Sequence, residues 1–175
     1  MRVIIGNEGI EVETDIIQIE DIDNKTLTEE ILSNKDRRLS WNPLQSRYED
    51  TELLVTTASK KLLFKIDTSV KLNVNPLLKG EEVWSHILEP NQSTMYHDHK
   101  EERDGVSFVY YVTYPEDSGN LVFEFDVLGK KVCKSIKPKV GELILFPTYI
   151  PHFTTRNVSD EIRISISGNY FPMNR

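Results

Sequence analysis

The sequence predicts a mainly β fold, a jelly roll (double-stranded β-helix), with helices from the N-terminal part packed on it. Two observations lead to this prediction. From residue 81 onward, short runs rich in β-branched and aromatic residues alternate with clusters of turn-forming residues. No helical pattern separates these runs, which is typical of an antiparallel barrel or sandwich.

Eight strands are expected in this second part of the chain. Segments rich in Pro, Gly, Asn, Asp and Ser separate several of them, for example residues 115–119 and 157–160. The expected strands are 82–88, 94–99, 106–113, 120–125, 131–136, 142–146, 152–155 and 162–170. Eight consecutive short strands suit a jelly roll.

The first part of the chain carries helical signals. Thr26 and Glu29 have the spacing of a capping box, which predicts a helix from there to about residue 36. Apolar residues at helical spacing predict a second helix over residues 52–64. The segment between them, residues 37–48, is expected to be a loop. We expect both helices to buttress the sheet.

Length and composition indicate one soluble domain. A chain of 175 residues with no low-complexity linker is expected to form one domain with one core. Within it, residues 1–80 would form a helical and extended support region, and residues 81–171 the β-helix core. The net charge of −7 argues against a surface that neutralises the phosphates of a nucleic acid.

The N-terminal sequence resembles neither a signal peptide nor a membrane span, because its short apolar run is soon followed by acidic residues. Cys133 is the only cysteine, so no internal disulfide is expected. We therefore expect a cytoplasmic protein without membrane contact, and a homodimer remains open. The expected partner is a small-molecule or protein side-chain substrate.

Three histidines suggest a metal site. His97 and His99 are separated by one residue in an expected strand, so both imidazoles should point to the same face. Asp98 should then point to the opposite face, unless a bulge changes the parity. His152 follows a Pro-bounded turn that would deliver it to the next strand. His86 has no partner at ligand spacing and is expected to be structural.

A site of this kind suits iron. Three imidazoles leave up to three positions of a six-coordinate metal open, which is typical of non-haem Fe(II), with Mn, Ni and Zn as competitors. A solvated strand end is the alternative interpretation of a short His-Asp-His motif, because such motifs have many false positives.

Residues 84–171 resemble the superfamily of 2-oxoglutarate and Fe(II)-dependent oxygenases. The similarity is to phage and bacterial members with a His-x-His pair and, more distantly, to prolyl hydroxylases. The matching motifs are HDH at 97–99, VSFVYYV at 106–112, SGNLVF at 118–123, GELILFP at 141–147, IPH at 150–152 and NVSDEIRISISGN at 157–169.

The resemblance implies Fe(II) and 2-oxoglutarate as cofactor and cosubstrate. Arg163 matches an arginine that grips the distal carboxylate of 2-oxoglutarate, and a guanidinium fork fits a carboxylate in a two-pronged fashion. Tyr111 matches a tyrosine that hydrogen-bonds the same carboxylate. Strand parity places Ser165 and Ser167 on the face of Arg163, so Ser165 is also expected to contact the cosubstrate. Tyr110 should point away.

The sequence departs from the superfamily pattern, in which most members use His-x-Asp followed by a distant His. Here His99 stands at the position of the acid, so three neutral imidazoles would leave the iron one more positive charge. The expected function is nevertheless an oxygenase that hydroxylates a substrate.

The main alternative is a cupin-like metal-binding protein that does not use 2-oxoglutarate: a cofactor-free dioxygenase, an isomerase or a sensor. His97 and His99 also fit the opening of a cupin motif, and Gly141 and Pro147 fit a second one. The acid ligand of a cupin is missing, and a cupin has no need of Arg163. A non-catalytic capsid or tail β-sandwich is a third possibility.

Overall fold

The computed structural model describes residues 2–6, 9–13, 15–36, 50–99 and 104–173. Its largest element is a six-stranded antiparallel sheet with the strand order β3-β9-β6-β11-β5-β4. Its strands are β3 (Asp15–Gln18), β4 (Asp50–Glu52), β5 (Leu78–Leu88), β6 (Val106–Thr113), β9 (Glu142–Pro147) and β11 (Arg163–Pro172). The two edge strands, β3 and β4, come from the first 80 residues and complete a sheet whose centre comes from the second part.

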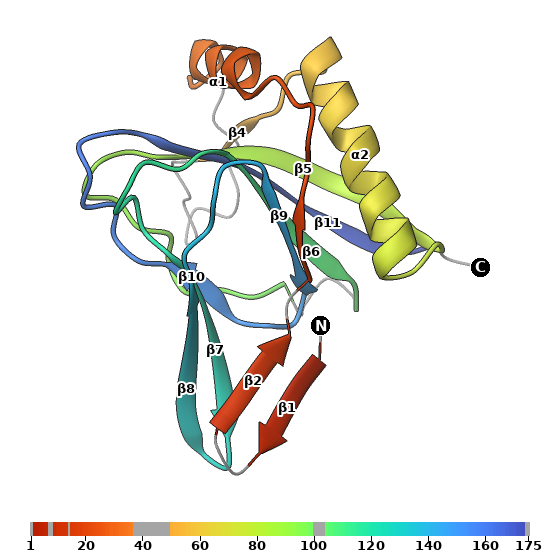
Figure 1. Cartoon of the computed structure of the whole chain (residues 1–175), viewed down its shortest axis with the longest axis vertical. Helices are drawn as coiled ribbons and strands as arrows, with labels where there is room; N and C mark the ends of the chain where they lie inside the picture. Colours follow the sequence, from red (N-terminus) through yellow and green to blue (C-terminus); the bar gives the residue numbers. More distant parts are fainter. Residues whose placement is uncertain (1, 7–8, 14, 37–49, 100–103, 174–175) are drawn as a thin grey trace.

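A smaller sheet faces the large one and has the order β10-β7-β8. It consists of β7 (Leu121–Val127), β8 (Lys130–Ile136) and β10 (His152–Thr154). A separate hairpin of β1 (Arg2–Gly6) and β2 (Gly9–Glu13) lies beside β7 in the view of Figure 1. The mainly β prediction is confirmed.

Two helices, α1 (Asn24–Ser33) and α2 (Thr57–Asn73), cover the face of the large sheet that lies away from the small sheet (Figure 1). Their buried side chains, among them Leu27 and Leu62, form one core cluster with Ile164 and Ile166 of β11. A second cluster, which includes Phe123 and Phe146, lies between the two sheets. The large sheet therefore has an apolar face toward the helices and another face toward the small sheet.

Seven of the eight expected strands are present, and the one over residues 94–99 is wrong. Residues 94–99 are joined to β10 by isolated backbone hydrogen bonds and do not form a continuous ladder with it. Within this segment, only His97 forms a β-bridge, with His152. A side-chain acceptor replaces part of the ladder, because Thr94 N donates to Thr154 Oγ1 at 2.8 Å.

Both helices exist, with different bounds from those expected. Asp23, not Thr26, caps α1, because its side chain accepts from the Thr26 backbone N–H. The capping box instead opens α2, between Thr56 and Ser59. The helix α2 begins later than expected because residues 50–52 form β4, and it continues to Asn73 because buried side chains persist at helical spacing.

The expected loop at residues 37–48 lies outside the described residues. Among the helices of the described part, none is both long and apolar enough to cross a membrane.

Candidate metal centre and its cavity

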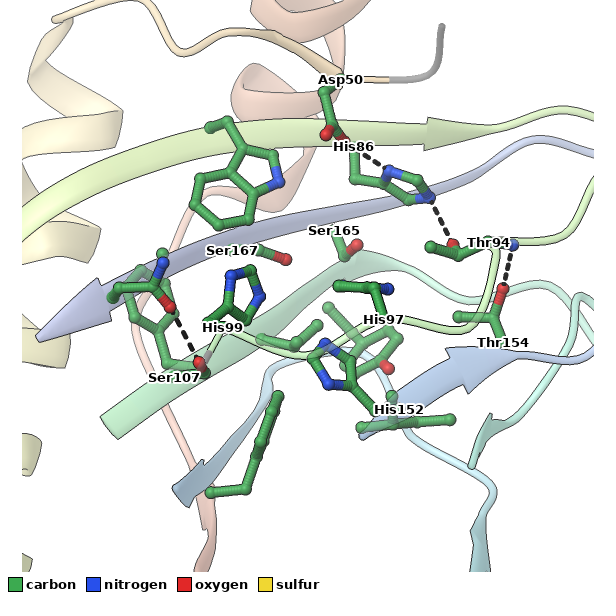
Figure 2. A pocket seen from close by; sticks show the side chains of 18 of the residues that line it. Asp50, His86, Thr94, His97, His99, Ser107, His152, Thr154, Ser165 and Ser167 are labelled. Carbon is green, nitrogen blue, oxygen red and sulfur yellow. Dashed lines mark hydrogen bonds and ion pairs between the residues drawn. The ribbon is translucent and has the colours of Figure 1, made fainter. Parts of the chain in front are cut away.

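A cavity opens between the two sheets, on the face of the large sheet that is turned away from the helices (Figure 2). Alternate residues of β11 contribute to its wall, namely Arg163, Ser165 and Ser167. The isoleucines between them, Ile164 and Ile166, belong to the core under the helices. The predicted division of this strand into a polar and an isoleucine face is confirmed.

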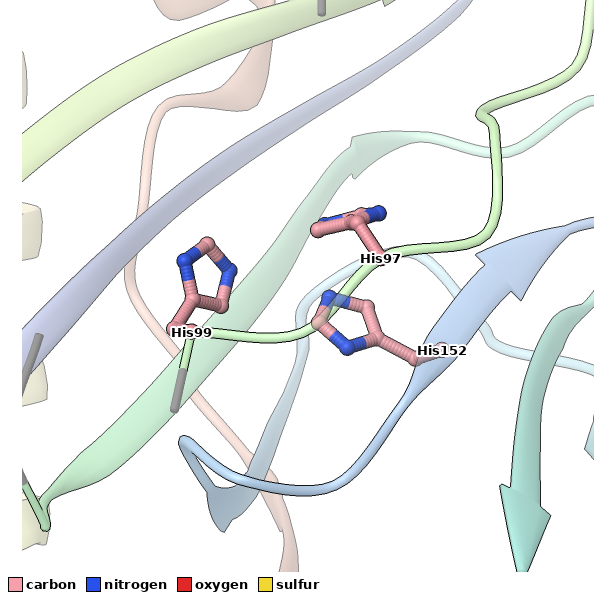
Figure 3. A group of neighbouring side chains, drawn as sticks. All are labelled: His97, His99 and His152. Carbon is pink, nitrogen blue, oxygen red and sulfur yellow. The ribbon is translucent and has the colours of Figure 1, made fainter. Parts of the chain in front are cut away.

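Three imidazoles meet at one side of this cavity (Figure 3). One nitrogen from each of His97, His99 and His152 lies within 4.8 Å of the other two. Their ring centroids are 4.1 Å apart for His97 and His152, and 5.3 Å for His97 and His99. The described part of the chain contains no other cluster of three or more His, Cys, Asp or Glu side chains with this spacing.

Backbone hydrogen bonds hold two of these histidines opposite each other. His97 N donates to the His152 carbonyl at 3.1 Å, and His152 N donates back at 2.8 Å. Residues paired in this way project their side chains to the same face. His99 is positioned separately, by a hydrogen bond from its backbone N–H to the Thr148 carbonyl at 2.9 Å.

The hydrogen bonds of two rings fix which ring nitrogen carries the hydrogen. The Nδ1 of His97 lies 2.7 Å from the Met95 carbonyl, and the Nδ1 of His152 lies 2.9 Å from the Ile150 carbonyl. A carbonyl oxygen only accepts, so each Nδ1 carries the hydrogen and each Nε2 keeps its lone pair in the neutral ring. Such an arrangement is common in metal-ligating histidines, where the second hydrogen bond orients the ring.

Asp98 is not a member of the three-imidazole cluster. The placement of His97 and His99 in one cluster agrees with the parity expected from their spacing, even though the segment is not a regular strand. The three histidines that the sequence predicts as ligands therefore lie together, and Asp98 is outside their cluster.

Among the residues whose burial the structure describes, Arg163 is the largest fully buried side chain, with 1% of its surface exposed. Its Nη1 donates to the Gly119 carbonyl at 2.9 Å, whereas its buried Nε has no hydrogen-bond partner. Burial lowers the pKa of Arg163. No carboxylate among the described residues pairs with it. A buried cation in this state is costly unless an anion joins it.

Two further side chains predicted to contact the cosubstrate lie close to Arg163. The Tyr111 ring centroid is 5.8 Å from the guanidinium carbon. Burial raises the pKa of Tyr111 to about 12, opposed by the positive charge of Arg163, so the phenol is neutral at physiological pH. Ser165 is the cross-strand partner of Tyr111. Tyr110 points to the other face, where its hydroxyl donates to Asn24.

The cavity also contains residues that the sequence did not reveal. Ser165 is paired on its other side with His86 of β5, and His86 is paired with Asp50 of β4. Both side chains line the cavity, as does Thr94. Strand parity with Trp84 could have placed His86 on this face, but nothing in the sequence linked Asp50 to it.

Comparison with known proteins identifies the family of the chain. The model of a family described as "Putative 2OG-Fe(II) oxygenase" matches residues 82–169. The chain belongs to this oxygenase family. Family membership confirms the resemblance found in the sequence and brings with it Fe(II) and 2-oxoglutarate. A comparison with curated proteins gave no match.

Solved structures of 2-oxoglutarate oxygenases share the fold. A prolyl-4-hydroxylase of Pseudomonas putida is 16% identical, with a TM-score of 0.67 over 92% of this chain and 93% of its own. The α-ketoglutarate-dependent carbocyclase SnoK from nogalamycin biosynthesis is 14% identical, with a TM-score of 0.65 over 90% and 79%. The epimerase SnoN from the same biosynthesis is 13% identical, with a TM-score of 0.65 over 91% and 78%. The double-stranded β-helix is thereby confirmed.

The residues of this oxygenase fit both groups that the family uses. Three imidazole nitrogens are suitable ligands for Fe(II). In the same cavity, the unpartnered Nε of Arg163 is a buried donor that a carboxylate can satisfy.

Proposed function

We propose that this oxygenase hydroxylates its substrate, a small molecule or a protein side chain, and that His97, His99 and His152 hold the iron. The observation that carries the proposal is the convergence of three imidazoles in a cavity that also contains a buried, incompletely paired arginine. The three imidazoles and Arg163 are complementary, because a metal bound by the imidazoles requires a chelating cosubstrate and the buried arginine requires an anion. 2-Oxoglutarate meets both requirements.

Fe(II), with O2 and 2-oxoglutarate, would supply the oxidising power: one oxygen atom of O2 would enter a C–H bond of the substrate and the other would enter the succinate formed when 2-oxoglutarate loses CO2. The chain contributes orientation and exclusion of water. The carbonyls of Met95 and Ile150 fix two of the imidazoles. The buried wall of the cavity limits access of water to the reacting groups.

Arg163 would anchor the distal carboxylate of 2-oxoglutarate. The hydrogen bond from Nη1 to Gly119 holds the guanidinium plane, so its remaining donors are oriented before the ligand arrives. Tyr111 stays protonated because burial raises its pKa, and a neutral phenol can donate to the same carboxylate. Ser165, between Tyr111 and His86 in the sheet, would add a hydroxyl.

Hydroxylation is proposed as the outcome because it is the simplest oxidation that this set of groups supports. A cupin-like protein without 2-oxoglutarate would leave Arg163 without an anion. The fold itself does not decide the reaction, because it also occurs in the carbocyclase and the epimerase named above.

A turnover experiment tests the proposal. The protein, reconstituted with Fe(II), is incubated with 2-oxoglutarate, O2 and a fractionated extract of small molecules and peptides, and mass spectrometry follows succinate and any product that gains one oxygen atom. We expect succinate formation that depends on Fe(II) and is lost in His152→Ala. Absence of succinate in every fraction from iron-loaded protein would contradict the proposal, and a product without added oxygen would replace hydroxylation by another oxidation.

A further inference from the structure

A second polar group lines the cavity, built around Asp50 and His86. Both side chains are buried, with 1% and 6% of their surfaces exposed. Asp50 Oδ1 lies 2.7 Å from His86 Nδ1, and His86 Nε2 lies 3.0 Å from Thr94 Oγ1 (Figure 2). The other carboxylate oxygen, Asp50 Oδ2, is buried and has no hydrogen-bond partner.

The direction of these hydrogen bonds follows from the carboxylate. An ionised carboxylate only accepts, so His86 Nδ1 donates to Asp50. In the neutral imidazole, Nε2 then accepts from the hydroxyl of Thr94. The remaining capacity of this group consists of lone pairs, on Asp50 Oδ2 and on the Thr94 oxygen. It can therefore satisfy a hydrogen-bond donor.

Arg163 has the opposite character, because a guanidinium only donates. The cavity thus has a donor end at Arg163 and an acceptor end at Asp50 and Thr94. Arg163 and His86 lie on adjacent strands, two residues out of register, since Arg163 pairs with Leu88 and His86 with Ser165. The three imidazoles line the same cavity.

The acceptor end is unsuited to the cosubstrate. 2-Oxoglutarate carries two carboxylates, and a buried carboxylate beside either of them would repel it. The molecule that meets Asp50 must instead carry an N–H or O–H group. The other reactant of an oxygenase is its substrate, and an unsatisfied buried acceptor favours a ligand that supplies the missing donor.

We infer that Asp50, His86 and Thr94 form a substrate-recognition site for a hydrogen-bond donor, an ammonium or a hydroxyl group, next to the metal centre. The identification of the bound molecule as the substrate rests on the proposed function. The site and the three imidazoles line the same cavity, and Thr94 N is bonded to Thr154 Oγ1, two residues from His152 on β10.

Titration followed by NMR tests this inference. The probes are n-butylammonium, 1-butanol and butyrate, added to the 15N-labelled full chain with and without Zn(II) and 2-oxoglutarate. We expect saturable shifts of the backbone amides of Asp50, His86 and Thr94 with the ammonium or the alcohol, and none with butyrate. The probe with the higher affinity identifies the donor. Shifts with butyrate alone, or with no probe in either state, would overturn the inference.

Variants show whether Asp50 accepts the donor. Asp50→Asn keeps the shape but turns one acceptor into an N–H donor, so we expect at least about tenfold weaker binding of the responding probe. Glu52→Gln is the matched control, since Glu52 lies on the same short strand with an exposed side chain. It should bind the probe as the wild type does. Equal weakening in both variants would indicate a general charge effect and overturn the inference.

Thr94→Val provides a second variant that leaves the Asp50 and His86 pair intact, in case Asp50→Asn does not fold, which the dispersion of the NMR spectrum reports. Thr94→Val should bind the probe severalfold more weakly than the wild type. Wild-type affinity in this variant would contradict the role given to the hydroxyl oxygen of Thr94. Failure of the proposed function would be seen separately, as absence of succinate formation or of 2-oxoglutarate binding, and would leave the probe titration interpretable.

Discussion

His97 and His152 are joined by a reciprocal pair of backbone hydrogen bonds, of 3.1 and 2.8 Å, although neither neighbour of His97 continues a ladder. This bridge brings together two residues that are 55 positions apart in the sequence. Because paired residues project to the same side, the two imidazoles face the same point of the cavity. Two of the three imidazoles of the candidate metal centre are therefore brought together by one local β-bridge between a loop and a short strand.

Removal of one imidazole should abolish tight metal binding. We expect His152→Ala to lose most of the Fe, Mn, Ni or Zn that the wild-type protein retains when purified without chelators, because two imidazoles remain. The affinity should fall by more than the roughly 10- to 100-fold typical of outer-shell substitutions. Elemental analysis measures this, with His86→Asn, a substitution in the same cavity but outside the three-imidazole cluster, as control. Equal metal content in His152→Ala and wild type would exclude His152 as a ligand.

Asp98→Ala should retain more metal than His99→Ala. His99 belongs to the three-imidazole cluster and Asp98 does not, so only the second substitution removes a ligand. Titration with Mn(II), followed by calorimetry, compares the two variants. If Asp98→Ala loses as much affinity as His99→Ala or more, the ligand set contains the carboxylate that most superfamily members use.

Gly119→Ala should disturb the arginine site. The backbone of Gly119 has a φ of +94°, and an added Cβ would lie 2.3 Å from the Thr155 carbonyl oxygen. Strain and overlap together should lower the free energy of unfolding by about 3 kcal/mol, and displacement of the Gly119 carbonyl should weaken 2-oxoglutarate binding. Gly129→Ala is the control, because Gly129 also has a positive φ but nothing lies within 4 Å of its added Cβ. It should cost about 1 kcal/mol and leave 2-oxoglutarate affinity unchanged. Chemical denaturation measures the free energy of unfolding of both variants, and calorimetry measures their affinity for 2-oxoglutarate. Equal values for the two variants would contradict the role given to Gly119.

The order of turns and β-rich runs was sufficient to predict the strands of the β core, because turn formers mark the boundaries between them. The strands β3 and β4 were not predictable in the same way. Each has only three or four residues and pairs with a strand of the second part, β3 with β9 and β4 with β5, which offers it an edge. Such pairing depends on the assembled sheet and leaves little trace in the sequence.

The three-imidazole cluster was predicted because its sequence signal is local: two histidines lie two residues apart, and a third follows a Pro-bounded turn. The acceptor end of the cavity was missed because Asp50 and His86 meet through the pairing of β4 with β5. A lone aspartate has no pattern in the sequence that links it to a distant strand. Arg163 was found through the family motif, while its burial and its bond to Gly119 required the structure.

The buried phenol of Tyr111 should make stability depend on alkaline pH. Its pKa is about 12 in the folded protein against an ordinary value of 10.0. Stability from this group is complete below pH 10 and is lost as the pH rises toward 12, because the unfolded chain releases the proton first. Over this pH range, the free energy of unfolding of Tyr111→Phe should fall by about 2 kcal/mol less than that of the wild type. Some decline remains in the variant, since burial also raises the pKa of Tyr110 and Tyr170. Denaturation at several pH values gives the comparison, and identical slopes would contradict burial of the Tyr111 hydroxyl.

Binding of 2-oxoglutarate through Arg163 tests the account most directly, and calorimetry with Mn(II) in place of Fe(II) measures it without turnover. We expect the wild-type protein to bind 2-oxoglutarate and Arg163→Ala to lose roughly 2 to 5 kcal/mol of binding free energy, the cost of leaving one member of a buried charge pair without its partner. Arg163→Lys should recover only part of this, because an ammonium lacks the planar fork, and metal affinity should change little in either variant. If the Mn(II)-loaded wild type shows no binding at millimolar 2-oxoglutarate, or if Arg163→Ala binds it as tightly as the wild type, the proposed site is contradicted.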